Sequence, residues 1–479
     1  MIERVAGIRL PKSLIVGAAA LVLGAIAVEF YADRQGLSYK ELIVVLGVLA
    51  AAIIVFGGER GIRFGLILWV LTLALGYRTI EWTQNLRIHP SEILIWLLFA
   101  CVCAQRRLRS VTRFSLPWWL WLLVPFFALA WWPLIAGDAP WDKMLNEFRN
   151  FLLLVPLMIV LSAVLKRESY WRYLLLAFFV ASTWIALMGV VEYWFPGVEK
   201  IFPAFIRAAK PEVTADGFIR GQFSFWGGSQ ATFICLLALP GAIFLTAWWR
   251  GWITRMAIIV GAVLQLIAIY IGGYRSVWFV LLIQVLAACV LRLKKHGLTV
   301  ALLVLVVAVA GYQFIPNTNE RLITGLAALQ GNPIDHSAQD RKERALEAVN
   351  GIFESPFGRG WSSAGWVHSD FLQVAANLGI IAGLIFLAGY FHTVLRIGKQ
   401  MPTWVRTTAQ GDLGLSLLLA FVGVGGLLAM QGVEVLPQMV LPVWFVWSLV
   451  DIWLRSASEA TELSYSYATA NLYPAANFQ

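Results

Sequence analysis

Residues 366–395 read WVHSDFLQVAANLGIIAGLIFLAGYFHTVL, and this stretch decides the kind of fold that the chain can adopt. A histidine and an aspartate, His368 and Asp370, stand before an almost unbroken apolar run over residues 371–395. A helix needs about 20 apolar residues to cross the hydrocarbon core of a bilayer, and this run is long enough. The sequence therefore predicts a membrane-spanning helix over residues 371–395, with a proton-binding side chain at its polar end.

The composition extends this character to the whole chain. Of its 479 residues, 60% are hydrophobic and only 13% are charged. A soluble domain of this size could not bury so much apolar surface, so the composition excludes a soluble enzyme and predicts an all-α polytopic membrane protein. The four cysteines lie inside apolar runs and form no C-x-x-C pair, which indicates neither a disulfide framework nor a zinc site.

Apolar segments long enough to be considered as membrane-spanning helices number about fourteen. They lie near residues 13–32, 41–57, 63–80, 91–104, 116–136, 148–165, 171–195, 229–249, 252–272, 274–292, 297–316, 371–395, 411–431 and 437–454. The segment at 91–104 is short for a span and could be re-entrant or merge with a neighbour. We therefore expect about 12–14 spans.

The Lys and Arg residues lie mainly in short loops on one side of these segments. Because cytoplasmic loops are enriched in Lys and Arg, this bias places both termini in the cytoplasm. It also accounts for the formal charge of +10 without a nucleic-acid partner. The predicted regions are N-terminal helices over 1–195, an outer loop over 196–228, central helices over 229–316, a large outer loop over 317–368, C-terminal helices over 369–454 and a disordered cytoplasmic tail over 455–479.

The large outer loop contains one amphipathic segment, SAQDRKERALEAVNGIF, at residues 337–353. Leu346, Val349 and Phe353 recur at helical spacing, with charged residues elsewhere on the surface. This pattern predicts a short helix whose apolar face lies on the membrane surface. Pro and Gly residues within NGIFESPFGRGW, residues 350–361, are expected to end it.

Basic side chains at the predicted outer boundary carry the candidate chemistry. His368 is a natural general base, because its ordinary pKa of about 6.5 lets it accept a proton near neutral pH. The alternative is a histidine that is merely hydrogen-bonded at a helix N-terminus beside Asp370. The planar fork of arginine suits phosphate oxygens, so Arg220, Arg275 and Arg341 could form a diphosphate clamp. The alternative for each arginine is a side chain that extends to lipid headgroups.

Motifs for a metal or a nucleotide are not recognisable in this sequence. It has no D-x-D motif of the kind that metal-dependent sugar transferases use, and no P-loop. We therefore expect no metal ion and no other cofactor.

Several of these stretches resemble segments of the O-antigen ligase and polymerase superfamily of bacterial membrane glycosyltransferases. FESPFGRGWSSAGWVHSDFLQVAANLGIIAGL, residues 353–384, is similar to the family's P-x-x-G-x-G element followed by a histidine and an H-x-x-[FLY]-L-Q helix. IRGQFSFWGGSQATF (219–233), GGYRSVWFVLL (272–282) and DRKERALEAV (340–349) resemble its other segments in the same order. The resemblance covers roughly residues 215–395. One departure is Ser369, where many members have Asn.

The resemblance implies a GT-C type enzyme of the inner membrane whose active site faces the periplasm. The donor would be a glycan on undecaprenyl diphosphate, and the acceptor a hydroxyl of a glycan or of lipid A-core. His368 would deprotonate or orient that hydroxyl, with Asp370 as possible support. Arg220, Arg275 and Arg341 would bind the diphosphate, and the metal-independent reaction would invert the anomeric centre.

Other functions stay open on the sequence. A polymerase uses the same chemistry as a ligase but adds the chain to a lipid-linked acceptor. A transporter belongs to a different class, and would be expected to show inverted repeats and charges at mid-membrane depth. The sequence shows no repeat, and its candidate charges gather at one predicted face, which disfavours a transporter. A ligase and a polymerase differ in the acceptor pocket, and we prefer the ligase. A protein O-oligosaccharyltransferase is a minor further option, because a larger acceptor-recognition domain would be expected.

Overall fold

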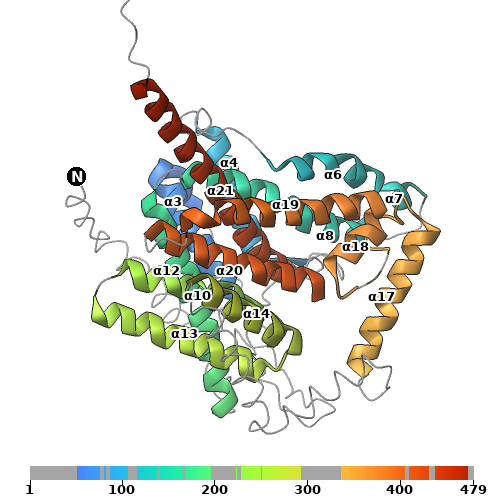
Figure 1. The fold of residues 1–479 in the computed structure, drawn as a ribbon. Coiled ribbons are helices and arrows are strands. Elements are labelled where there is room, and N and C mark those ends of the chain that lie inside the picture. Colours follow the sequence, from blue (N-terminus) through green and yellow to red (C-terminus); the bar gives the residue numbers. More distant parts are fainter. Residues whose placement is uncertain are drawn as a thin grey trace, which may run out of the picture.

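The computed structural model describes residues 51–75, 80–81, 87–105, 116–136, 141–165, 168–195, 223, 228–249, 251–292, 336–363, 365, 367–404, 409–430 and 437–472. Helices dominate this part of the chain, as Figure 1 shows. The elements are α3 (Gly58–Thr72), η1 (Leu73–Leu75), β1 (Ile80–Glu81), β2 (Arg87–Ile88), α4 (Pro90–Ala104), α6 (Trp118–Leu129), α7 (Trp132–Ala136), α8 (Trp141–Leu152), α9 (Leu154–Val164), α10 (Glu168–Trp194), α11 (Gly228–Ala238), α12 (Gly241–Trp248), α13 (Trp252–Gly272), α14 (Arg275–Arg292), α17 (His336–Glu354), α18 (Asp370–Leu378), α19 (Ile380–Trp404), α20 (Ala409–Met430) and α21 (Pro437–Leu472). The strands β1 and β2 form one short antiparallel ladder.

Within the described residues, eight helical segments are long and apolar enough to cross a membrane. They are Trp118–Ile135, Trp141–Val164, Tyr170–Trp194, Trp252–Gly272, Arg275–Arg292, Ile380–Gln400, Gly411–Met430 and Met439–Ser456. The pair α11 and α12, bent by 42°, makes a ninth if it is one broken span. This is the architecture of a polytopic membrane protein, with fewer described spans than the fourteen that the sequence predicts.

The difference in span number has two sources. The predicted spans at 13–32 and 297–316, and most of that at 41–57, lie outside the described residues. The segments predicted near 63–80 and 91–104 are the helices α3 and α4, which have 15 residues each. A straight helix of that length is short for a bilayer core, because each residue contributes only about 1.5 Å.

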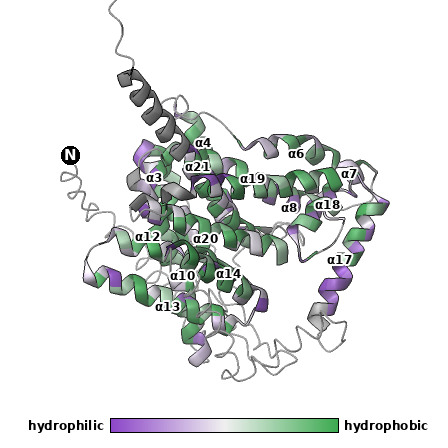
Figure 2. Cartoon of the chain, viewed as in Figure 1, coloured by the Kyte–Doolittle hydropathy of each residue, from purple (hydrophilic) through white to green (hydrophobic). Residues whose placement is uncertain are grey.

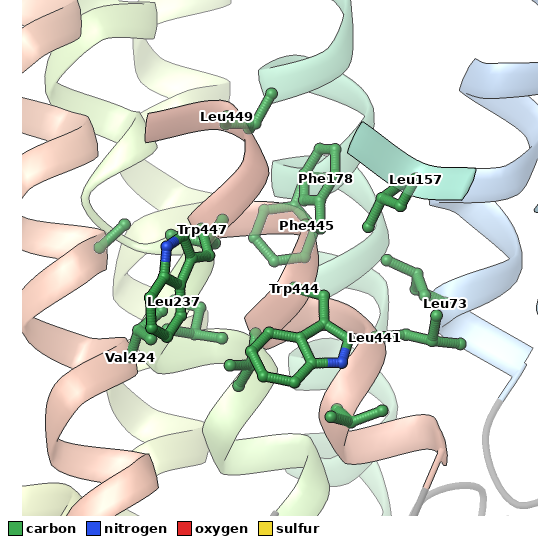
Figure 3. Close-up of a cluster of buried hydrophobic side chains, with 14 of the residues drawn as sticks. Leu73, Leu157, Phe178, Leu237, Val424, Leu441, Trp444, Phe445, Trp447 and Leu449 are labelled. Carbon is green, nitrogen blue, oxygen red and sulfur yellow. The ribbon is translucent and has the colours of Figure 1, made fainter. Parts of the chain in front are cut away.

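Helix α21 forms the centre of the bundle. Trp444, Phe445 and Trp447 are fully buried, and Figure 3 shows them among side chains from α9, α10, α11 and α20. The indole Nε1 of Trp444 donates a hydrogen bond to the carbonyl oxygen of Asn150 at 2.8 Å. Lipid is as apolar as these side chains, so close packing and hydrogen bonds of this kind must hold the helices together.

The tail that was predicted to be disordered is helical over its described part. α21 continues to Leu472, so the prediction was wrong for residues 455–472. The physical reason is that these residues include neither glycine nor proline. Nothing in the local sequence therefore stops a helix that the buried span has already nucleated.

The single span predicted over residues 371–395 is two helices. α18 ends at Leu378, Gly379 has φ +100°, and α19 begins at Ile380. The two helices pack closely at Gly383, where an added Cβ would lie only 2.5 Å from the Cβ of Ala375. The span is therefore Ile380–Gln400, and α18 is a separate helix beside it. Hydropathy could not reveal this break, since an apolar run has the same composition whether it is straight or folded back.

Residues 355–361 dock against the end of α18. The backbone N–H groups of Arg359 and Gly360 donate to the carbonyl oxygens of Ala376 and Asn377 at 3.2 and 2.9 Å. Carbonyl groups in the last turn of a helix have no intrahelical partner, so the docked segment acts as a C-terminal cap. Gly358, with φ +89°, makes this approach possible.

Helix α17 confirms the helix that the sequence predicts in the large outer loop. Figure 1 shows it crossing beside the ends of the bundle helices, rather than running along them. Its buried side chains, Ala348 and Ile352, pack against a small cluster that includes Val367 and Ala376. Leu346 and Phe353 are 52% and 74% exposed, and Figure 2 shows hydrophilic residues along the middle of the helix. The contact between its exposed apolar face and the membrane stays a prediction.

We expect Gly358→Ala to destabilise the protein, because a Cβ there would lie 2.5 Å from the carbonyl oxygen of Asn377. The positive φ adds a strain of about 1–3 kcal/mol. The measurement is the midpoint of thermal unfolding in detergent. Gly365→Ala is the control for strain alone, since Gly365 has φ +65° and open space around it.

Gly398→Ala is the neutral control, because a Cβ at this helical position meets nothing within 4 Å. We expect the midpoints to fall in the order Gly398→Ala, Gly365→Ala, Gly358→Ala. Equal midpoints for Gly358→Ala and Gly398→Ala would show that the docked segment does not depend on its glycine.

Candidate functional site

His368 lies in the loop that leads into α18, and its side chain is half-buried against α17. Its Nε2 is 3.8 Å from Oδ2 of Asp340. Both oxygens of Asp340 also accept hydrogen bonds from Nε of Arg344, at 2.9 and 3.0 Å. The structure therefore joins the histidine of one segment to a carboxylate and a guanidinium of another.

The pKa of His368 lies below its ordinary value of 6.5. Burial is the largest cause, because it disfavours the charged imidazolium. The positive charge of Arg341 lowers the pKa further, the carboxylate of Asp340 raises it, and Arg344 lowers it. The imidazole is consequently neutral at physiological pH, which is the form that accepts a proton.

The structure brings two of the predicted site residues together. Arg341 is close enough to His368 to shift its pKa by charge. Arg275 is half-buried at the first position of α14, after a turn in which Gly273 has φ +68°. Arg275 is not among the described groups that shift the pKa of His368. Arg220 lies outside the described residues, so the convergence of three arginines stays a prediction.

Asp370 is fully buried and is the first residue of α18. A carboxylate in the first turn of a helix is favoured by the partial positive charge of the helix N-terminus. The carboxylate that the structure places beside the His368 ring is that of Asp340. Support of His368 by Asp370 stays a prediction.

Sequence reasoning missed Asp340 as the partner of His368. Its only visible signal was the spacing of Asp340 and Arg344, which lie one helical turn apart and can pair. Nothing in the sequence could show that this pair faces a histidine in a later segment. That contact depends on the break at Gly379 and on the docking of α17 against α18.

Gln373 was part of the quoted H-x-x-[FLY]-L-Q pattern, but sequence reasoning gave it no role. Its side chain is fully buried on α18. Its Oε1 accepts a hydrogen bond from the N–H of Val367 at 2.8 Å, and its Nε2 donates to the carbonyl oxygen of Gly365 at 2.7 Å. One side chain thus satisfies two backbone groups immediately before His368. The glutamine fixes the backbone from which the histidine projects.

Metal ligands do not gather in the described part of the chain, where no group of three His, Cys, Asp or Glu residues could hold an ion. A scan against protein-family models finds no match to this chain. No curated protein matches it at a significant level. The resemblance to the O-antigen ligase and polymerase superfamily therefore stays a prediction.

We expect Arg341→Gln and Asp340→Asn to move the pKa of His368 in opposite directions. Removing the cation at Arg341 raises the pKa, so His368 becomes protonated at a higher pH. Removing the anion at Asp340 lowers it. The measurement is the rate at which diethyl pyrocarbonate modifies His368 as a function of pH, read by mass spectrometry, because only neutral imidazole reacts.

The wild-type protein is the control, and its His368 profile should lie between those of the two variants. Shifts of the His368 profile in the same direction for both variants would contradict the arrangement of charges described above.

Proposed function

We propose that the protein is a glycosyltransferase of the bacterial inner membrane. It moves a glycan from undecaprenyl diphosphate to an acceptor hydroxyl at the periplasmic face, as an O-antigen ligase does. The observation that carries this proposal is the position of His368, whose Nε2 lies 3.8 Å from Oδ2 of Asp340 on α17 and whose pKa is lowered by burial and by Arg341. His368 lies outside the spans, beside a helix that supplies two arginines. A base for a hydroxyl and cations for a diphosphate are the groups that this reaction requires.

In the proposed step, the acceptor hydroxyl gives its proton to His368 while its oxygen attacks the anomeric carbon of the donor sugar. The bond between that carbon and the phosphate oxygen breaks, and the diphosphate leaves with the electron pair. Arginine guanidinium groups stabilise the negative charge that develops on the leaving group. Attack opposite to the leaving group inverts the anomeric centre, and no metal is required.

The position of Arg275 supports a role in holding the diphosphate. It begins α14, and the N-terminus of a helix attracts anions through its free N–H groups and partial positive charge. Figure 1 shows the turn between α13 and α14 towards the same end of the bundle as α17. The apolar side chains on the outer face of α13 are exposed, including Ile259, Val260 and Val263. They form a surface that can face lipid, so the undecaprenyl chain of the donor can remain in the bilayer beside it.

A transfer assay tests the proposal directly. Purified protein in nanodiscs is incubated with an undecaprenyl-diphosphate glycan, with and without lipid A-core. We expect transfer that depends on the core and does not change with EDTA. His368→Ala should lower the rate by on the order of 10²–10⁴-fold, because it removes the general base. Arg275→Ala should lower it as well.

Lys342→Ala is the matched control, since Lys342 is an exposed cation next to Arg341 on α17 and should not affect the rate. Growth of a ladder without lipid A-core would make the protein a polymerase of the same chemistry. No transfer to any acceptor from well-folded protein would overturn the proposal and favour the transporter. Full activity of His368→Ala would remove the histidine from the mechanism.

A further inference from the structure

Glu147 is a buried carboxylate in a membrane-spanning segment, and the proposed mechanism does not use it. It belongs to α8, within the span Trp141–Val164, and is only 5% exposed. Its Oε2 accepts a hydrogen bond from the backbone N–H of Ser362 at 2.6 Å. The same oxygen accepts a second one from Nδ2 of Asn377 at 2.9 Å.

The two donors flank the candidate base. Ser362 precedes His368 in the chain, and Asn377 follows it in the last turn of α18. One carboxylate oxygen of α8 therefore closes the whole segment 362–377 into a loop. Gln373 then fixes the backbone inside that loop. Two sets of hydrogen bonds therefore hold the segment that carries His368. Glu147 bonds to both ends of the segment, and Gln373 bonds to the backbone in its middle.

The backbone at Ser362 needs such a hydrogen bond. Its φ is +63°, a left-handed conformation that non-glycine residues adopt only when their surroundings enforce it. The carboxyl oxygen of Glu147 that accepts from its N–H provides this constraint, because a buried N–H that loses its acceptor is costly.

The residue before Ser362 is also anchored to the bundle. Trp361 is 1% exposed, and its backbone N–H donates to the carbonyl oxygen of Ala130 at 3.1 Å. Its ring packs against Phe148 with centroids 5.7 Å apart, and Phe148 follows Glu147 in α8. Two adjacent residues of α8 thus contact this part of the chain. Phe148 packs against Trp361, and Glu147 accepts the hydrogen bond from Ser362.

A buried carboxylate is costly unless it is well hydrogen-bonded, and ionisable groups inside membrane spans usually serve function. We propose that Glu147 is a positioning residue, which holds segment 362–377 so that His368 meets Asp340 and Arg341. The expected effect of Glu147 on catalysis rests on the proposed function. Its effect on the position of segment 362–377 rests only on the hydrogen bonds described above.

The experiment compares Glu147→Ala with Glu147→Gln and wild type, in nanodiscs, by two readouts. Hydrogen–deuterium exchange measures the protection of amides in residues 361–368, which does not require activity. Steady-state transfer separates kcat from the KM for the lipid-linked donor. We expect faster exchange in Glu147→Ala and a kcat about tenfold to a hundredfold lower, because small misplacement of a catalytic group is costly. KM should change little, since the arginines are intact.

Glu147→Gln keeps an acceptor oxygen of the same reach, and should restore most of the protection and of kcat. Asn377→Leu removes the second hydrogen bond to Glu147, which Nδ2 of Asn377 donates. Combined with Glu147→Ala, it should add little to the loss, because the two residues act through one interaction. Asp412→Asn is the matched control. It neutralises a buried carboxylate of α20 that pairs with Arg292, and should alter neither the exchange of residues 361–368 nor kcat.

Unchanged exchange in Glu147→Ala would overturn the inference, whatever the protein catalyses. Faster exchange with an unchanged kcat would overturn the positioning role. An equal fall of kcat in Asp412→Asn would also overturn it, because any loss of a buried charge would then suffice. A wild-type protein that transfers no glycan would overturn the proposed function, while exchange would still decide whether Glu147 holds the segment.

Discussion

The candidate site depends on a contact of backbone with backbone, between the segment around Gly358 and the end of α18. Gly358 and Gly379 both have positive φ angles. A Cβ on Gly379 would lie 2.7 Å from the carbonyl carbon of Phe357, just as one on Gly358 would meet Asn377. Only glycine permits such an approach in such a conformation. The contact ends α18 short of the span and directs the preceding chain towards α17, where His368 meets Asp340.

Helix α17 divides its surface between two tasks. Ala348 and Ile352 are small or slender enough to pack against α18, so the helix keeps a fixed distance from the loop of His368. Its Asp340 and Arg344 then act on the histidine through charge, and the two have opposite effects on its pKa. Burial, Arg341 and Arg344 all lower the pKa of His368, and together they outweigh the opposite effect of Asp340. A helix that is amphipathic in sequence thus serves both as a scaffold and as the electrostatic environment of the candidate base.

Sequence alone could predict the helical membrane character and α17, because these depend on the transfer of side chains from water and on helical periodicity. It also pointed to His368 and Arg341, which the structure brings together. It could not predict the break at Gly379, since hydropathy is insensitive to backbone direction. Nor could it reveal Asp340 as the partner of His368, or the hydrogen bonds of Glu147, because both join segments that are distant in the chain.

The buried polar groups around the loop make its position part of the fold. Glu147, Gln373 and Asn377 are each almost inaccessible, and each bonds to the segment between residues 360 and 367. If that segment lifted away, each of the three would lose at least one hydrogen bond in an apolar environment, which is far more costly than the loss of exposed hydrogen bonds. The network therefore opposes opening of the loop cooperatively. His368 lies outside the described spans, yet hydrogen bonds from Glu147 on α8 and Gln373 on α18 hold the segment that carries it.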